Sequence, residues 1–76
     1  MRLYVQFENP EAARIAWRNM QREPSEVACD RGVLAWELPT VRKGVALTLP
    51  EMEACAGKLL DQIAEVGVGE FRAELF

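Results

Sequence analysis

The side chains able to carry covalent chemistry in this 76-residue chain are few and scattered. There is no histidine, so the usual base for serine and cysteine nucleophiles is missing, together with the commonest metal ligand. The hydroxyl groups of Ser25, Thr40 and Thr48 have no obvious base beside them in the sequence. The lack of a nucleophile–base pair predicts that the protein is not an enzyme.

The two cysteines, Cys29 and Cys55, lie on separate predicted elements and lack the Cys-x-x-Cys spacing of redox and zinc sites. A zinc site needs about four ligands, and only Asp30 is close in sequence. No glycine-rich phosphate loop follows a predicted strand. We therefore expect packed, reduced thiols, no metal site and no cofactor.

Three arginines are regularly spaced on the first predicted helix. Arg14, Arg18 and Arg22 recur every four residues along a predicted helix, and we call them the arginine ridge. Like charges at this spacing repel by about 0.2–0.5 kcal/mol per pair. Two interpretations stay open: a solvated helix face in which Glu11 pairs with Arg14, or a ridge that grips an acidic partner or a phosphate.

The elements that must position these residues follow from hydrophobic periodicity. Alternating apolar and polar residues lead into a Pro-initiated helix at two places, which is an internal repeat of strand and helix. The predicted elements are a strand over 2–8, a helix from 10 to about 22, extended structure within 26–38, a strand over 44–49, a helix over 50–66 and a strand over 70–76.

The order β-α-β-β-α-β predicts one domain over residues 1–76, of the α+β class, with both helices on one face of an antiparallel-rich sheet. This is the two-layer ferredoxin-like sandwich, in which right-handed crossovers place the first strand and the 44–49 strand in the centre. Residues 26–38 are either one kinked strand or a small hairpin around Gly32. The stripe from Met52 to Ile63 is expected to face the core.

Two helices on one face leave the other face of the sheet uncovered. Tyr4 is expected there, near Val33, Ala35 and Phe76, and such a face is often buried in a homodimer. Base stacking on Tyr4 is disfavoured, because the predicted neighbouring strand carries no aromatic ring. The candidate partner-binding residues are Arg14, Arg18, Arg22 and Tyr4.

Bulk properties exclude further classes. The formal net charge of −3 disfavours a domain that holds nucleic acid through phosphate contacts. The apolar runs are far shorter than the roughly 20 residues of a membrane-spanning helix. The first residues lack the apolar run and cleavage site of a secretory signal, so the expected compartment is the cytoplasm.

The function predicted from these exclusions is a small, non-catalytic binding protein that occupies the surface of a protein partner. In size and acidity the chain is similar to antagonists made by phages and mobile elements, such as anti-CRISPR proteins. The alternative is a ligand sensor: ACT-like regulatory domains share the strand and helix order and bind small molecules near the first strand–helix turn, where this chain has Asn9 and Pro10 in place of the usual glycine. A weaker alternative is nucleic-acid binding through Arg14, Arg18, Arg31, Arg42 and Lys43.

Overall fold

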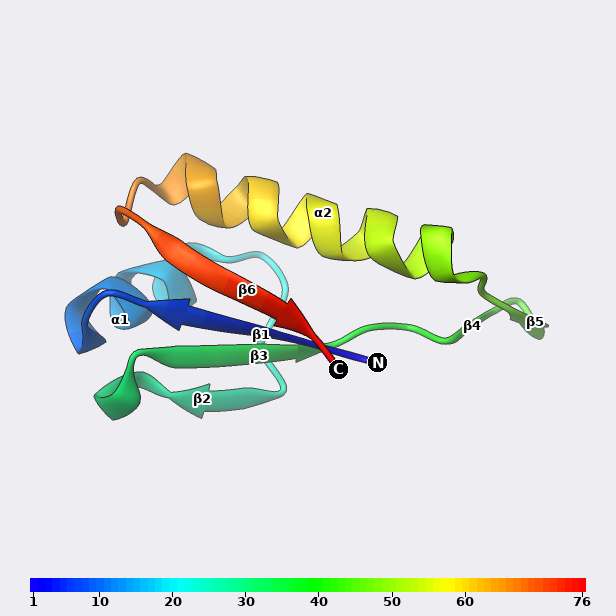
Figure 1. Ribbon diagram of the computed structural model, residues 1–76, viewed down its shortest axis with the longest axis horizontal. Coiled ribbons are helices and arrows are strands. Elements are labelled where there is room, and N and C mark those ends of the chain that lie inside the picture. Colours follow the sequence, from blue (N-terminus) through cyan, green and yellow to red (C-terminus); the bar gives the residue numbers. More distant parts are fainter.

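The computed structural model describes all 76 residues and contains one main sheet and two helices (Figure 1). The elements are β1 (Arg2–Phe7), α1 (Pro10–Asn19), β2 (Glu26–Ala28), the 3₁₀ turn η1 (Cys29–Arg31), β3 (Val33–Glu37), β4 (Val41–Arg42), β5 (Val45–Ala46), α2 (Leu49–Val66) and β6 (Phe71–Leu75). The strand pairs of the main sheet are all antiparallel. The chain therefore has the α+β class that the sequence predicts.

The two central strands of the main sheet are β3 and β1, within the order β2-β3-β1-β6. Leu3 of β1 stands between Trp36 of β3 and Leu75 of β6. Because successive side chains of a strand point to opposite faces, these three residues share the face that the helices cover. Tyr4, the next residue of β1, belongs to the other face.

Residues 26–38, for which a kinked strand and a hairpin were both considered, form a hairpin. β2 and β3 pair antiparallel, and η1 connects them through Gly32, which has a φ of 70°. A Cβ atom at Gly32 would lie 3.1 Å from the carbonyl oxygen of Phe7. Glycine is thus required both by the left-handed backbone and by the close approach of β1.

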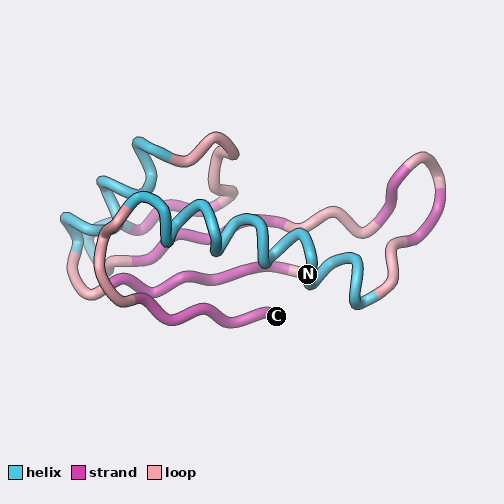
Figure 2. Tube along the Cα trace, turned by 90° about the horizontal axis from the view of Figure 1, so that it is seen from above, coloured by secondary structure: helices cyan, strands magenta, loops and turns pink.

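The prediction of a central strand over residues 44–49 is wrong. β4 and β5 form a separate two-stranded hairpin that stands clear of the main sheet (Figure 2). Its turn contains Lys43 and Gly44, whose φ values of 52° and 77° are those of a tight hairpin turn. This turn pairs the two flanking segments with each other, and neither segment pairs with a strand of the main sheet.

β3 takes the central position that had been assigned to residues 44–49. Its Leu34 and Trp36 are fully buried, whereas Val45 of β5 is 68% exposed. Burying a large apolar side chain stabilises the fold by about 1.5–3 kcal/mol, so β3 gains far more than β5 from a place beside β1. The order of strands predicted around β1 is corrected accordingly.

The first helix is shorter than predicted. It begins as expected, because Pro10 occupies the first turn and the Asn9 side chain accepts a hydrogen bond of 2.8 Å from the Ala12 N–H. It ends at Asn19 and not near Arg22, because Met20 has an extended backbone and packs in the core with 9% of its surface exposed. Arg22, the last residue of the arginine ridge, therefore lies outside the helix.

The second helix confirms its predicted bounds to within one residue, running from Leu49 to Val66. Thr48 and Glu51 form a capping box at its start, in which each side chain accepts a hydrogen bond from the backbone N–H of the other residue. Gly67 ends the helix with a left-handed backbone at a φ of 78°.

A single hydrophobic cluster lies between the sheet and both helices. Its members include Leu3, Val5 and Phe7 of β1, Leu34 and Trp36 of β3, Ala12, Ala13 and Ala16 of α1, and Ala56, Leu59 and Ile63 of α2. The predicted core stripe of α2 is thus buried at these three positions and half-buried at Met52. Trp36 is the largest fully buried side chain, and its Nε1 donates a 2.9 Å hydrogen bond to the Arg22 carbonyl oxygen.

β6 is less covered than the sequence suggests. Phe71, Ala73 and Leu75 face the helix layer, yet Ala73 is exposed and Leu75 keeps 38% of its surface exposed. A shallow cavity of about 350 Å³ separates β6 from α2 on this side. β6 is therefore an edge strand that α2 covers only partly.

We predict that Trp36→Phe lowers the free energy of unfolding by about 1–3 kcal/mol, because it removes core volume and leaves the Arg22 carbonyl without its donor. The matched control is Trp17→Phe: Trp17 is 40% exposed and bonds to the exposed Glu23. We expect that change to cost about 0.5 kcal/mol or less. Urea unfolding followed by circular dichroism measures both, and equal losses would contradict the assigned core.

The capping box predicts a dependence of stability on acid. Hydrogen bonds from the Thr48 backbone and side chain lower the pKa of Glu51 below its ordinary value of 4.5. A carboxylate whose pKa is lowered on folding makes its full contribution to stability above its unfolded-state pKa. That contribution is lost as the pH falls through the folded-state pKa. Glu51→Gln retains a capping acceptor but cannot titrate, so its stability relative to wild type should rise as the pH falls from 5 to 3. A constant difference across that range would refute the assignment.

Candidate functional site

The candidate site is the face of the main sheet opposite the helices, which we call the open face. Tyr4 lies at its centre on β1, with Ala35 of β3 on one side and Glu74 of β6 on the other. The side chains of this face come from alternate residues of the strands, because the intervening residues fill the core. The local alternation that builds the core thus also assembles the open face.

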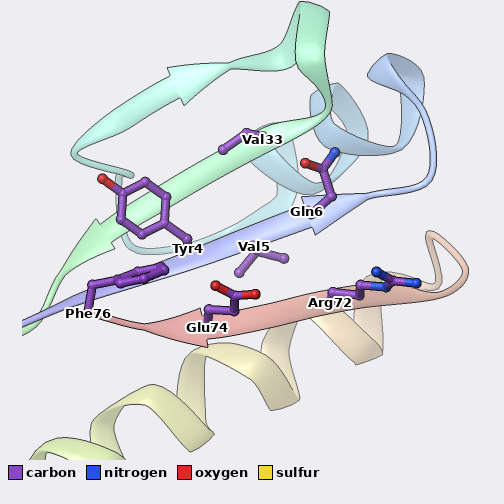
Figure 3. A pocket seen from close by; sticks show the side chains of 7 residues that line it. All are labelled: Tyr4, Val5, Gln6, Val33, Arg72, Glu74 and Phe76. Carbon is purple, nitrogen blue, oxygen red and sulfur yellow. The ribbon is translucent and has the colours of Figure 1, made fainter.

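A shallow cavity of about 350 Å³ marks the middle of the open face (Figure 3). It is lined by Tyr4, Val5, Gln6, Val33, Arg72, Glu74 and Phe76. The rings of Tyr4 and Phe76 meet edge to face, with centroids 5.3 Å apart and planes at 84°. Phe76 keeps 69% of its surface exposed, so the pair offers a large apolar surface to a partner.

Arg2 holds the hydroxyl end of Tyr4 in place. Its Nη1 donates to the Tyr4 hydroxyl at 3.1 Å, and its Nε donates to the Glu37 carboxylate at 2.8 Å. A second carboxylate, that of Glu26, lies 3.9 Å from Nη1. The hydrogen bonds to Tyr4 and Glu37 raise the pKa of Arg2 above its already high value, so this anchor stays charged at every working pH. The ring of Tyr4 is therefore positioned before any partner arrives.

Arg72 and Glu74 supply charge on the other side of the cavity. Both are exposed, and neither forms an ion pair within the chain. Gln6 and Tyr4 stand opposite them on β1, so their nearest cross-strand neighbours are uncharged. The open face thus presents one free cation and one free anion next to its aromatic pair.

Sequence reasoning identified Tyr4 and Phe76 on this face but did not single out Arg72 and Glu74. The signal was available in the alternation of β6, because inward-facing Phe71, Ala73 and Leu75 leave Arg72 and Glu74 on the opposite face. What could not be read from the alternation was that β6 pairs directly with β1, which brings these charges beside Tyr4.

The arginine ridge is divided in the structure. Arg14 pairs with Glu11 at 3.4 Å on the exposed side of α1, and Arg18 is also exposed on this helix. Arg22 lies beyond the end of α1 and donates a hydrogen bond to the Glu37 carbonyl oxygen at the end of β3. Because α1 packs on the helix-covered face, Arg14 and Arg18 do not share a surface with Tyr4.

The first strand–helix turn, where the ligand-sensor alternative would place its site, is already engaged internally. Asn9 caps α1 through its own side chain, and Pro10 contributes no N–H. The basic residues of the nucleic-acid alternative are spread out: Arg42 and Lys43 lie on the protruding hairpin, away from Arg14 and Arg18 (Figure 1).

The remaining candidate chemistry is dispersed. Cys29 and Cys55 are free, half-buried thiols on η1 and α2. No group of three or more histidine, cysteine, aspartate or glutamate side chains is placed to hold a metal ion. The protruding hairpin adds an apolar surface that the sequence did not single out, with Val41 and Val45 more than half exposed.

On the open face, aromatic, apolar and oppositely charged side chains meet around a hollow. Neither helix has the length and apolar character needed to cross a membrane. What the open face binds has to be inferred from its own chemistry, because no protein-family model, no curated protein and no solved structure matches the chain.

Proposed function

We propose that this chain is a small, non-catalytic binding protein of the cytoplasm that acts by occupying the surface of a protein partner with its open face. The observation that carries the proposal is the pair of half-buried Tyr4 and exposed Phe76 beside a cavity of about 350 Å³. Exposed aromatic residues that border a hollow are typical centres of protein interfaces.

The charges around the cavity favour a protein as the occupant. Arg72 and Glu74 present both signs within one strand, which suits a partner that carries both signs at the same spacing. A phosphate backbone would meet Glu74 as a repulsive charge, and the chain as a whole carries a net charge of −3. The position of Tyr4 is fixed by Arg2, so little side-chain freedom is lost on binding.

The fold proposed for this function is ferredoxin-like with an inserted hairpin. If β4 and β5 are set aside, the remaining order is β-α-β-β-α-β with β1 and β3 at the centre of an antiparallel sheet. This arrangement supports the view that the open face is a feature of the architecture, since a two-layer sandwich covers only one side of its sheet. A binding protein of this kind would act as an antagonist by blocking its partner's surface, as anti-CRISPR proteins do.

Capture of partners by affinity-tagged protein tests the proposal. Tyr4→Ala and Phe76→Ala should each weaken binding of the captured protein by about tenfold or more, because each removes an aromatic contact from the centre of the interface. Arg14→Glu combined with Arg18→Glu is the matched control on the opposite layer and should leave capture unchanged. Binding constants measured by calorimetry with the purified partner give the magnitudes.

The outcomes separate the alternatives. Capture that survives both aromatic changes but is lost on reversal of Arg14 and Arg18 would move the interface to α1 and overturn the proposed site. Stabilisation of the protein by a free amino acid in a thermal-shift series, without any captured protein, would favour the ligand sensor. Circular dichroism establishes that each variant keeps its fold.

A further inference from the structure

β6 has a neighbour on one side only, because β1 pairs with one edge of it and no strand lies at the other. Arg2 and Phe76 exchange both of their backbone hydrogen bonds, at 2.7 and 2.9 Å. In an antiparallel pair, residue pairs that exchange hydrogen bonds alternate with residue pairs whose N–H and C=O groups point away from the partner strand. The residues of β6 whose N–H and C=O groups point to the free edge are therefore Phe71, Ala73 and Leu75.

This edge has few of the devices that prevent pairing with another strand. Natural edge strands are commonly blocked by proline, by charged side chains (lysine above all), by a bulge or by an inward-pointing charge. β6 has the sequence Phe-Arg-Ala-Glu-Leu, with no proline and no inward-pointing charge, and its two charges have opposite signs. Its charged residues, Arg72 and Glu74, project from the open face and leave the edge itself free.

The sequence of β6 is complementary to itself in one antiparallel register. With Ala73 on a twofold axis, Arg72 stands opposite Glu74 of the partner subunit, and Phe71 stands opposite Leu75 of the partner subunit. A shift of the axis by one residue in either direction would place like charges opposite each other, at Arg72 or at Glu74. Cross-strand charge pairs thus select the register centred on Ala73.

We infer that a second copy of this chain pairs with β6 edge to edge, joining two sheets into one continuous antiparallel sheet. In this register Ala73 and its symmetry mate, and likewise Phe71 and Leu75 of the partner subunit, exchange the backbone hydrogen bonds that the free edge offers. Arg72 and Glu74 fall in the intervening positions, where opposing side chains are closest. The interface is isologous, so it closes as a dimer and does not propagate.

The helix side of β6 has room for the second copy. The cavity of about 350 Å³ between α2 and β6 is lined by Gly57, Leu60 and Leu75. Gly57 lies in the middle of α2, where glycine is a poor helix former, and an added Cβ would meet no atom within 4 Å. The open space next to Leu75 lies on the side where Phe71 of the partner subunit stands opposite Leu75 in this register.

The pairing would place both open faces on the same side of the joined sheet, because the twofold axis that relates the two antiparallel strands is perpendicular to the plane of the sheet. The two Tyr4–Phe76 pairs would then lie on one surface. The edge pairing shares Arg72 and Glu74 with the function proposed for the open face, but its backbone hydrogen bonds come from the free edge of β6 and do not depend on that function.

Charge reversal tests the register. Sedimentation equilibrium of wild type should show a mass that rises with concentration from 8.6 kDa toward twice that value. Arg72→Glu alone, and Glu74→Arg alone, should weaken the dimer by about tenfold or more, because each puts like charges opposite each other twice. The double variant restores opposite charges and should recover the wild-type dissociation constant. A wild type that stays monomeric at millimolar concentration, or a double variant that fails to recover, would overturn the inference.

Amide hydrogen exchange distinguishes the edge from the open face as the dimer contact. On dimerisation the amides of Phe71, Ala73 and Leu75 should become protected, whereas those of Arg72 and Glu74 already bond to β1 and should change little. Ala73→Pro removes an N–H group that points to the free edge and has no partner in β1. This variant should therefore give a folded monomer. Dimerisation that is abolished by Tyr4→Ala while the edge amides stay exposed would place the contact on the open face and overturn the edge pairing.

Discussion

The fold depends on a single apolar layer between the sheet and two helices. A chain of 76 residues buries too little surface to build a second such layer. The inward side chains of β1 and β3 and the alanines of α1 fill this layer, with Trp36 as its largest fully buried member. Covering one face of the sheet leaves the other face exposed, and that exposed face is where the aromatic pair lies.

On the open face, the ring of Tyr4 is held in position by polar contacts of its hydroxyl group. Arg2 links Tyr4 to Glu37, so a network on the surface fixes an aromatic ring that the core does not touch. Arg72 and Glu74, by contrast, are charged groups without partners inside the chain. A rigid aromatic centre beside free charges of both signs is suited to recognition of another protein.

Local signals and long-range competition contributed differently to the fold. The boundaries of α2 could be predicted because Thr48, Glu51 and Gly67 act on their immediate neighbours. The position of residues 44–49 could not, because two segments of similar apolar character competed for one place beside β1. The turn at Lys43 and Gly44 pairs one of them with its own neighbour. The β3 segment, which buries Leu34 and Trp36, occupied the sheet.

The α+β class, the starts of both helices, the alternation of β1 and the placement of Tyr4 away from the core could be predicted from the residues alone. These features depend on residue spacing and on capping groups a few residues apart. Only the tertiary structure shows that β3, and not the segment over residues 44–49, takes the second central place beside β1. It also separated Arg22 from Arg14 and Arg18, because packing of Met20 ended α1 before the helical spacing could apply. Strand order and helix ends of this kind follow from competition for the core, which no local pattern of residues encodes.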